Sequence, residues 1–383
     1  MDYDKKSLEM HERLKGKIST KVDFEINTKD DLSIAYTPGI AAVSKAIIDN
    51  ENNLRKFTSA GKTVAVISNG TSVLGLGDVG AKAAYPVMEG KSALFKAFGG
   101  VDSIPICVDI KDVDAFINFV EKVSINFAGI NLEDIKAPEC FFIEKKLKER
   151  LSIPVFHDDQ HGTAVVVGAA LDNSLGLAGK KLEDIKIVIS GAGSAGIAIC
   201  KLLKNMGATN IFLMDSKGLV TNNRNYGEFE FEKKSFATDS DLVSLSDVIK
   251  DADVFIGVSK PGILTKDHVK SMNSKPIVFG LSNPIPEIMP KDAKDAGAFI
   301  VATGRSDFDN QINNVLAFPG IFKGALSVNA TNITEEMKVA AVKAISSYHD
   351  ASIDSILPSS LDKNIHGIVA KKVANSWLEN KKS

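Results

Sequence analysis

Residues 185–215 read IKIVISGAGSAGIAICKLLKNMGATNIFLMD, and this stretch decides the fold of the chain. The apolar strand at 185–190 is followed by six small residues, Gly191, Ala192, Gly193, Ser194, Ala195 and Gly196. A helical pattern at 197–207 and a second strand at 210–214 come next, and Asp215 ends that strand. Glycines let the backbone approach a pyrophosphate, free N–H groups of a helix N-terminus bind the anion, and an acid roughly 20 residues further on reaches the ribose hydroxyls. The stretch therefore predicts a βαβ unit that binds a dinucleotide.

Outward from this unit, short apolar strands continue to alternate with helical patterns. The later strands are DVFIGV at 253–258, PIVFGL at 276–281 and AFIVAT at 298–303. Such alternation is typical of helices covering a parallel sheet. It predicts a Rossmann-like, doubly wound parallel sheet, followed by a helical tail over 334–382.

Residues 1–160 have a different pattern. They begin with a charged helical segment and contain apolar strands at 63–68, 103–109 and 152–156, with many glycines between Gly70 and Gly100. A chain of 383 residues is long enough for two domains, each with its own core. We therefore expect an α/β protein with an N-terminal α/β domain at 1–160 and the dinucleotide-binding domain, with its C-terminal helices, at 161–383.

The composition narrows the class of partner. The formal net charge is −2 and 44% of the residues are hydrophobic, so no basic surface is indicated for nucleic acid or an anionic membrane. No apolar run approaches the roughly 20 residues of a membrane span, and the charged start does not resemble a secretory signal. The three cysteines form no C-x-x-C pair. We expect a cytoplasmic protein with a small-molecule substrate.

Acidic residues form a second candidate site. Glu133 and Asp134 are adjacent, and adjacent side chains face one ion only at the end of an element. Asp158 and Asp159 follow the strand at 152–156, where open parallel sheets place their ligands. Oxygen ligands without a thiolate would suit Mg²⁺ or Mn²⁺. Helix capping by these same acids is an equally good interpretation of the sequence.

Single residues complete the set of candidates. Tyr36 precedes a Thr-Pro-Gly turn that would hold a phenol out into a cleft, although a buried core tyrosine is the commoner case. Lys91 lies at an expected helix start, where its alternative is a solvated surface lysine. Asn283 opens an Asn-Pro turn, and Asn313 and Asn314 lie in a loop, so turn chemistry alone would account for all three.

The combination of motifs resembles the malic enzymes, specifically the short bacterial type. In order, the motifs are YTPGIA, LGLGDVG, MEGKSALFK, NLEDIKAPECF, PVFHDDQHGTA, GAGSAG, SNP and NNVLAFPGIF, and they run from Tyr36 to Ala325. The resemblance implies a malic-type N-terminal domain. It also implies oxidative decarboxylation of L-malate to pyruvate and CO₂ with reduction of a nicotinamide coenzyme.

The resemblance further assigns roles to residues of this chain. It implies a general acid at Tyr36, a general base at Lys91, metal ligands at Glu133, Asp134 and Asp159, and substrate-binding asparagines at Asn283 and at Asn313 or Asn314. A base role for Lys91 needs its pKa lowered by burial and a nearby cation. The longer malic enzymes have an arginine shortly before the LGLGD motif, whereas this chain has Thr71, Ser72 and Val73. By the same analogy we expect a homodimer.

The coenzyme and the exact reaction have alternatives. Asp215 repels a 2′-phosphate and favours NAD⁺, whereas Lys217 and Ser216 would offset part of that repulsion, so NADP⁺ is expected to be used as well. A malolactic enzyme has related motifs but releases lactate. A metal-free dehydrogenase would use the dinucleotide-binding unit and leave Glu133, Asp134 and Asp159 as helix caps. A nucleotide sensor without catalysis would also need that unit, but not Lys91 or Tyr36.

Overall fold

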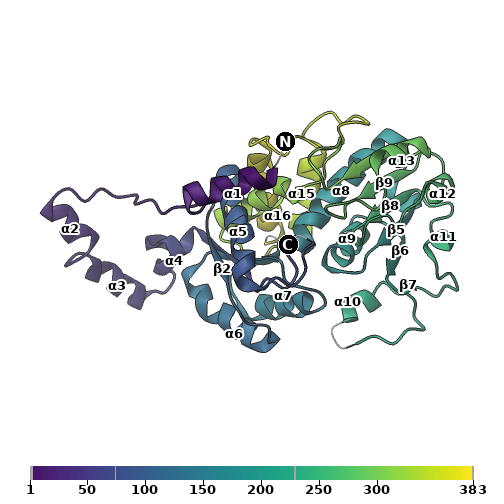
Figure 1. Cartoon of the computed structure of the whole chain (residues 1–383). Helices are drawn as coiled ribbons and strands as arrows, with labels where there is room; N and C mark the ends of the chain where they lie inside the picture. Colours follow the sequence, from purple (N-terminus) through teal and green to yellow (C-terminus); the bar gives the residue numbers. More distant parts are fainter. Residues whose placement is uncertain (1–2, 74, 228–229, 382–383) are drawn as a thin grey trace.

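Four parallel strands form the N-terminal sheet. The computed structural model describes residues 3–73, 75–227 and 230–381 (Figure 1). The strands are β1 (Thr63–Ser68), β2 (Asp102–Cys107), β3 (Gly129–Leu132) and β4 (Val155–His157), in the order β2-β1-β3-β4. β1 is wholly buried, as its apolar sequence TVAVIS predicts. The helices connecting these strands are α5 (Gly80–Leu94), α6 (Val113–Val123) and α7 (Glu139–Arg150).

The second sheet has six strands in the order β10-β9-β8-β5-β6-β7. They are β5 (Lys186–Ser190), β6 (Asn210–Asp215), β7 (Gly218–Leu219), β8 (Val254–Gly257), β9 (Ile277–Gly280) and β10 (Ile300–Thr303). All pairs are parallel except β6 with β7. Its helices are α9 (Ser194–Asn205), α10 (Phe231–Lys234), α11 (Leu245–Val248), α12 (Lys266–Lys270) and α13 (Pro290–Asp295). The predicted α/β class and the Rossmann-like sheet are confirmed.

One continuous apolar core joins the two sheets. Helix α8 (Asp158–Ala178) runs between them and packs against α9 and against α15 (Glu335–Ser346). Helices α14 (Phe318–Ser327) and α16 (Ile365–Asn380) pack on each other. In α14, the rings of Phe318 and Phe322 lie 4.7 and 5.3 Å from the ring of Phe95, which follows α5. The C-terminal helices therefore complete the core of the N-terminal part.

Two local expectations are wrong. The tail over 334–382 is not one helical run, because residues 347–364 separate α15 from α16. Lys91 is not at a helix start, because α5 begins at Gly80 and continues through Pro86. A proline removes only one N–H from a helix, and the remaining bonds of this buried helix maintain it.

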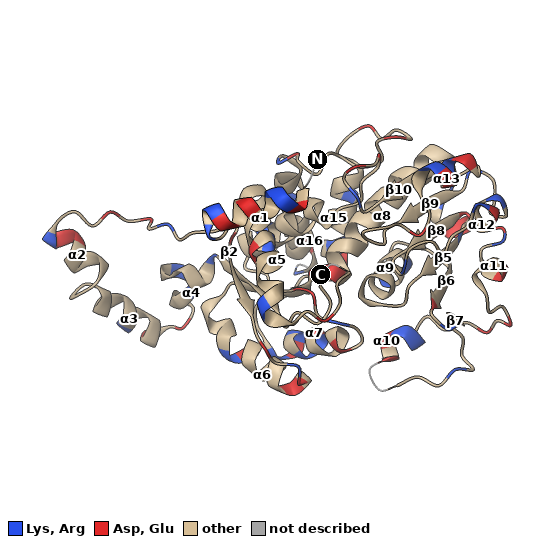
Figure 2. Cartoon of the chain, viewed as in Figure 1, with Lys and Arg blue, Asp and Glu red and all other residues tan. Residues whose placement is uncertain are grey.

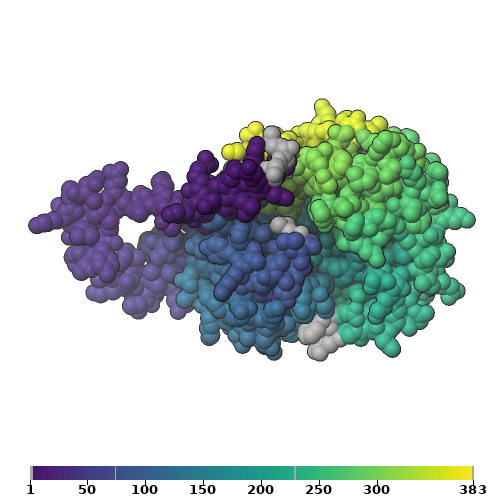
Figure 3. All heavy atoms as spheres, in the orientation of Figure 1, coloured from purple at the N-terminus to yellow at the C-terminus, as the bar shows by residue number. Residues whose placement is uncertain are grey.

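Residues 3–57 contain an extension of unusual shape. Helix α1 (Tyr3–Leu14) lies against the body, whereas α2 (Lys29–Ala35) and α3 (Ile40–Asp49) project away from it, and α4 (Asn53–Phe57) leads back (Figures 1 and 3). Neither α2 nor α3 buries a residue. Acidic and basic residues are interspersed over the ribbon (Figure 2), in agreement with the small net charge. Among the described residues, no helix is both long enough and apolar enough to cross a membrane.

Candidate active site

Three carboxylates meet at the carboxyl edge of the N-terminal sheet. β3 and β4 are parallel neighbours, so the residues that follow them lie side by side. One oxygen each from Glu133, Asp134 and Asp159 lie within 4.8 Å of one another. Asp134 has a φ of +53°, which turns it toward the same point as its neighbour, and its N–H donates to Asp159 Oδ2 at 2.8 Å. The end of an element thus allows the two adjacent acids to converge, as expected.

The geometry does not fit the helix-capping alternative. No helix begins within four residues of Glu133 and Asp134, because α7 starts at Glu139. The N-cap of α8 is His157, which makes no side-chain cap bond, and the Asp158 carboxylate accepts hydrogen bonds from Lys91 and Asn314. These acids are therefore arranged around a shared space.

Lys91 lies directly beside this cluster. Its Nζ is 2.8 Å from Glu133 Oε1 and 2.6 Å from Asp158 Oδ2, and it lies 4.5 Å from the centre of the Phe318 ring. The lysine is 9% exposed and Asp158 is fully buried. α5 therefore brings the predicted base to the predicted metal ligands.

The electrostatics of the cluster show an excess of negative charge. Burial raises the pKa of Glu133 and of Asp158 to about 7, and that of Asp159 to about 6, although Lys91 opposes all three shifts. Burial alone would lower the pKa of Lys91, but Asp158 and Glu133 outweigh it and raise the pKa well above its usual range. This is the opposite of the shift expected for a base, because the surrounding carboxylates stabilise the ammonium ion.

A divalent cation would fit this cluster. Three buried or half-buried carboxylates, Glu133, Asp158 and Asp159, act on the single ammonium group of Lys91, and buried carboxylates are costly unless their charge is balanced. Glu133, Asp134 and Asp159 offer hard oxygen ligands with no thiolate, which suits Mg²⁺ or Mn²⁺. Both these oxygen ligands and the excess of negative charge around Lys91 agree with the predicted metal ligands.

A buried ionic group beneath the cluster was not predicted from the sequence. Glu144 of α7 accepts from His161 Nε2 at 2.8 Å, from Lys148 at 2.8 Å and from the His157 N–H at 3.2 Å. Burial lowers the pKa of both histidines to about 4, so they are neutral. Glu144 thus holds the junction between β4 and α8 in place. The only available signal was an acid on the apolar face of the helix at 139–150.

The predicted asparagines have different positions. The Asn314 amide donates to Asp158 Oδ2 at 2.7 Å and thereby reaches the cluster, whereas Asn313 Oδ1 caps the short helix at 314–316. Asn283 is exposed, and its carbonyl lies against the LGLGDVG loop, where a Cβ at Gly75 would be 3.0 Å away. The described part of that loop, residues 75–80, is a tight turn with positive φ at three glycines, Gly75, Gly77 and Gly80.

Tyr36 is far from the other candidates. It is the C-cap of α2, is 67% exposed, and lies on the projecting segment of Figure 1. The structure therefore does not bring Tyr36 and Lys91 of one chain together.

The glycine turn of the second sheet has the expected shape. Gly191 has a φ of +120°, and a Cβ there would lie 2.6 Å from the Val258 carbonyl. A Cβ at Gly196 would collide with the Gly191 carbonyl. α9 begins directly after Gly193, so its free N–H groups point at the turn. A cavity of about 250 Å³ at this turn is lined by Ala192 and Gly193 and, from the N-terminal part, by Ala137, Pro138 and Phe141.

Asp215 ends β6 as predicted, but it is not a free carboxylate. Arg224 Nη1 lies 2.9 Å and Lys233 Nζ 3.4 Å from its oxygens, and the Lys217 N–H donates to it at 2.9 Å. Burial alone would raise its pKa, yet the Arg224 and Lys217 hydrogen bonds lower it. All four residues line a second cavity of about 250 Å³, so its charge is less negative than the sequence suggested.

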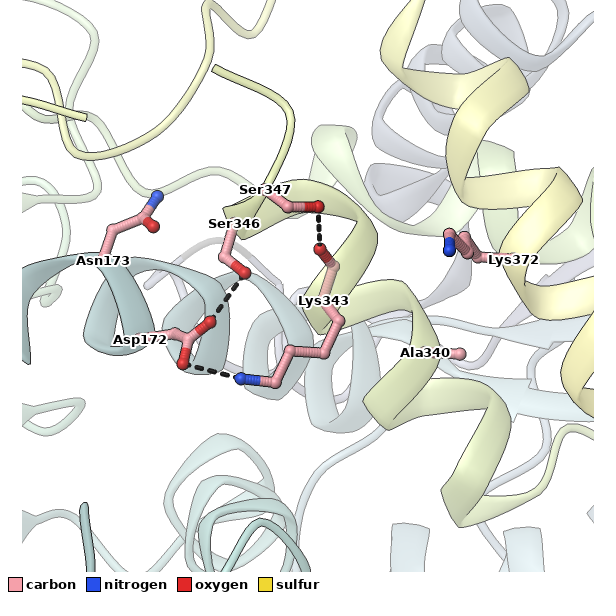
Figure 4. Close-up of a pocket in the computed structure, with 7 residues that line it drawn as sticks. All are labelled: Asp172, Asn173, Ala340, Lys343, Ser346, Ser347 and Lys372. Atoms are coloured by element: carbon pink, nitrogen blue, oxygen red, sulfur yellow. Dashed lines mark hydrogen bonds and ion pairs between the residues drawn. The ribbon is translucent and has the colours of Figure 1, made fainter. Parts of the chain in front are cut away.

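A larger hollow, of about 530 Å³, lies elsewhere, between α8, α15 and α16 (Figure 4). Lys343 and Ser346 both bond Asp172 across it, at 2.8 and 2.7 Å. None of the predicted site residues lines it.

A glycine turn in a Rossmann-like sheet, together with a buried lysine among carboxylates, is typical of a dinucleotide-dependent enzyme. Residues 15–148 match the family model "Malic enzyme, N-terminal domain", and residues 160–377 match "Malic enzyme, NAD binding domain". The chain belongs to the malic enzyme family. This confirms the family, the fold and the class of NAD(P)-dependent malic enzyme predicted from the motifs.

Individual relatives agree with this placement. The chain is 51% identical to a bifunctional malic/malolactic enzyme of Bacillus subtilis, over 99% of this chain and 94% of the relative. It is 46% identical to an NADP-dependent malic enzyme of Escherichia coli, over 97% of this chain but 52% of that relative. The solved structure of an NAD-dependent malic enzyme of Thermotoga maritima superposes with a TM-score of 0.93 at 45% identity, covering 96% of this chain and 98% of that one.

Proposed function

We propose that this protein oxidises L-malate at C2 with a nicotinamide coenzyme and decarboxylates the product to pyruvate and CO₂. One observation carries the proposal. Lys91 Nζ lies 2.8 Å from Glu133 and next to three carboxylates within 4.8 Å of one another, so a proton acceptor and a cation site share one place. The segment after Asp134 lines the same cavity as the glycine turn, which supports coenzyme and substrate meeting there.

Glu133, Asp134 and Asp159 would hold Mg²⁺ or Mn²⁺. Such an ion, when bound, acts as a Lewis acid on the C2 oxygen of the substrate. Asp158 anchors Lys91 and Asn314 through one oxygen, Oδ2, and so orients both toward the substrate. Asn283 and Asn313 or Asn314 would bind malate, and the contact with Asp158 supports Asn314 over Asn313.

Two proton carriers are required. Lys91 accepts the proton of the C2 hydroxyl as hydride leaves for the coenzyme, and compensation of the carboxylates by a cation would bring its raised pKa down for that role. Tyr36 donates a proton to C3 after loss of CO₂, which releases pyruvate. Each acid–base role contributes about 10²–10⁴-fold.

Both coenzymes are proposed to serve. Asp215 favours NAD⁺, but Arg224 and Lys233 neutralise much of its charge, so a 2′-phosphate is tolerated. The preference for NAD⁺ expected from Asp215 alone is therefore reduced to a small one.

Product analysis tests the function. The purified protein is incubated with L-malate, Mn²⁺ and either coenzyme, and pyruvate, lactate and reduced coenzyme are measured. Pyruvate and reduced coenzyme in equal amounts, lost in excess EDTA, is the expected result. Lactate without reduced coenzyme would indicate a malolactic enzyme, full turnover in EDTA a metal-free dehydrogenase, and no turnover a nucleotide sensor.

A further inference from the structure

Two loops at the carboxyl edge of the second sheet are joined by one buried carboxylate. The strands β8 and β9 are parallel neighbours and end opposite each other at Gly257 and Gly280. Glu287 is fully buried behind the loops that follow them. Its Oε1 accepts the Ser259 N–H at 2.9 Å, and its Oε2 accepts the Ser282 N–H at 3.0 Å. Each oxygen therefore holds the loop that follows a different strand.

The backbone around Glu287 is shaped for its side chain. A Cβ at Gly257 would lie 2.4 Å from the Glu287 Cδ and would displace the carboxylate. The Gly262 N–H donates to the Pro286 carbonyl at 3.3 Å, and the Leu264 N–H donates to the Glu287 carbonyl at 3.1 Å. Burial raises the pKa of Glu287, and backbone N–H groups oppose that shift. Since a buried carboxylate costs free energy unless it is hydrogen-bonded, the side chain and the two loops hold each other in place.

The loop after β8 forms one wall of the glycine turn. A Cβ at Gly191 would lie 2.6 Å from the Val258 carbonyl oxygen and 3.2 Å from the Ser259 Cβ. The hydroxyl oxygens of Ser190 and Ser259 lie 3.3 Å apart. The position of Ser259, which Glu287 holds, therefore bears directly on the turn proposed to bind the coenzyme.

The loop after β9 carries the candidate malate ligand Asn283, which directly follows Ser282. From the other side, Arg305 Nη1 donates to the Pro284 carbonyl at 2.8 Å. A Cβ at Gly304 would lie 3.0 Å from the Asn283 Nδ2, so the amide lies beside the segment that follows β10. The Asn283 turn is thus held by Glu287 through Ser282 and by Arg305 through Pro284.

We propose that Glu287 is a positioning residue that sets the Asn283 turn against the glycine turn, so that malate and coenzyme meet in the geometry required for hydride transfer. The inference rests on the proposed function, which assigns Asn283 to malate and the glycine turn to the coenzyme. Glu287 is buried behind both loops and acts through them. Reacting atoms must lie roughly 3–3.5 Å apart, and a misplacement of about 1 Å can cost about 100-fold in rate. Loss of the carboxylate is therefore expected to affect both ligands.

Glu287→Gln tests this role, because the amide has the same shape but only one oxygen to accept the two N–H groups. We expect the KM for L-malate to rise about 10-fold, and the Kd for NADH to rise about 3-fold or more, within the usual coupling between contacting residues. Fluorescence titration measures the NADH affinity without turnover. In an Asn283→Ala background the same change is expected to alter the malate KM less than about 2-fold, because residues that act through one another are not additive.

Asp253→Asn is the matched control. Asp253 is also buried and accepts the Lys186 N–H at 2.9 Å, but it lies at the opposite edge of the same sheet, before β8. This change is expected to lower the stability to urea and to leave the malate KM and the NADH Kd unchanged. If Glu287→Gln behaves in the same way, its role is only structural and the inference is overturned. Additive effects of Glu287→Gln and Asn283→Ala on the malate KM would overturn it as well.

Two further arms keep the test decisive. If Glu287→Gln does not fold, Glu287→Asp replaces it, because the shorter side chain reaches only one of the two N–H groups and the same changes are expected. A wild-type protein that does not convert malate refutes the proposed function instead. The NADH titration then decides the inference alone, since a raised Kd in Glu287→Gln supports it and an unchanged Kd overturns it.

Discussion

At the scale of single residues, the charge state of each important side chain depends on the oppositely charged groups beside it. Lys91 among carboxylates is held as an ammonium ion, and Asp215 beside Arg224 and Lys233 is held as a carboxylate. The sequence shows the residue types but not these partners, because Lys91 and Asp158 are 67 positions apart. Two predictions belong to this scale.

Asp159→Asn is expected to weaken Mn²⁺ binding by about 100-fold or more. Even the loss of a residue that only hydrogen-bonds to a metal ligand typically lowers the metal affinity about 10–100-fold. Electron paramagnetic resonance of free Mn²⁺ measures this without turnover, and malate oxidation is expected to be lost in parallel. Glu149→Gln, an exposed change on α7, is the control. Unchanged Mn²⁺ affinity in Asp159→Asn would show that this carboxylate does not bind the ion and interacts only with the other acids and Lys91.

Lys233→Gln is expected to lower kcat/KM for NADP⁺ about 10-fold or more and to leave NAD⁺ nearly unchanged. A hydrogen bond to a charged group contributes about 1.5–3 kcal/mol, and that contact exists only with the 2′-phosphate. Lys217→Gln is the comparison, because the sequence alone pointed to Lys217. A larger effect at Lys217 would restore that first interpretation.

At the scale of elements, one of the C-terminal helices buries a histidine side chain. His366 of α16 is fully buried, 5.5 Å from the Phe98 ring, and neither ring nitrogen has a partner in the described part of the chain. Burial lowers its pKa to about 4, from 6.5. The folded state thus binds fewer protons than the unfolded chain between these values, so stability is complete above pH 6.5 and falls as the pH decreases toward 4.

When the pH is lowered from 7 to 5, protonation linked to His366 is expected to decrease the free energy of unfolding by about 2 kcal/mol. His366→Leu and His366→Phe remove the titrating ring, and both are expected to lose less stability than wild type over that interval. Urea unfolding at the two pH values measures the difference. Equal losses in wild type and both variants would contradict the prediction.

At the scale of the whole molecule, the apolar residues exposed on α2 bear on the homodimer expected by analogy. Ile34→Asp places a charge on the exposed apolar face of α2, where Ile34 is 68% exposed. If a second copy covers that face, light scattering is expected to change from twice 41.0 kDa toward 41.0 kDa, and activity is expected to fall with it. Lys29→Asp, at a polar position of the same helix, is the control. A wild-type protein that is already monomeric would contradict the premise.

The sequence by itself determined the α/β class, the glycine turn, the family and all described strands except β3 and β7, which were not predicted. These features depend on local patterns: alternating apolar runs, glycines that need positive φ or close approach, and motifs of a few residues. It also pointed to Glu133, Asp134 and Asp159 through the resemblance to the malic enzymes, whereas the residue pattern alone left helix capping equally possible. It misplaced Lys91 along its helix and treated residues 334–382 as one helical run.

The tertiary structure alone decided how these residues are combined. Pairing of β3 with β4 brings the three acids together, and packing of α5 beside them supplies Lys91. Folding of 224–233 onto Asp215 neutralises it, and extension of residues 24–52 carries Tyr36 away from its own chain's site. Each is a contact between distant positions, whose free energy comes from burial and charge in the folded chain, and no local pattern in the sequence encodes it.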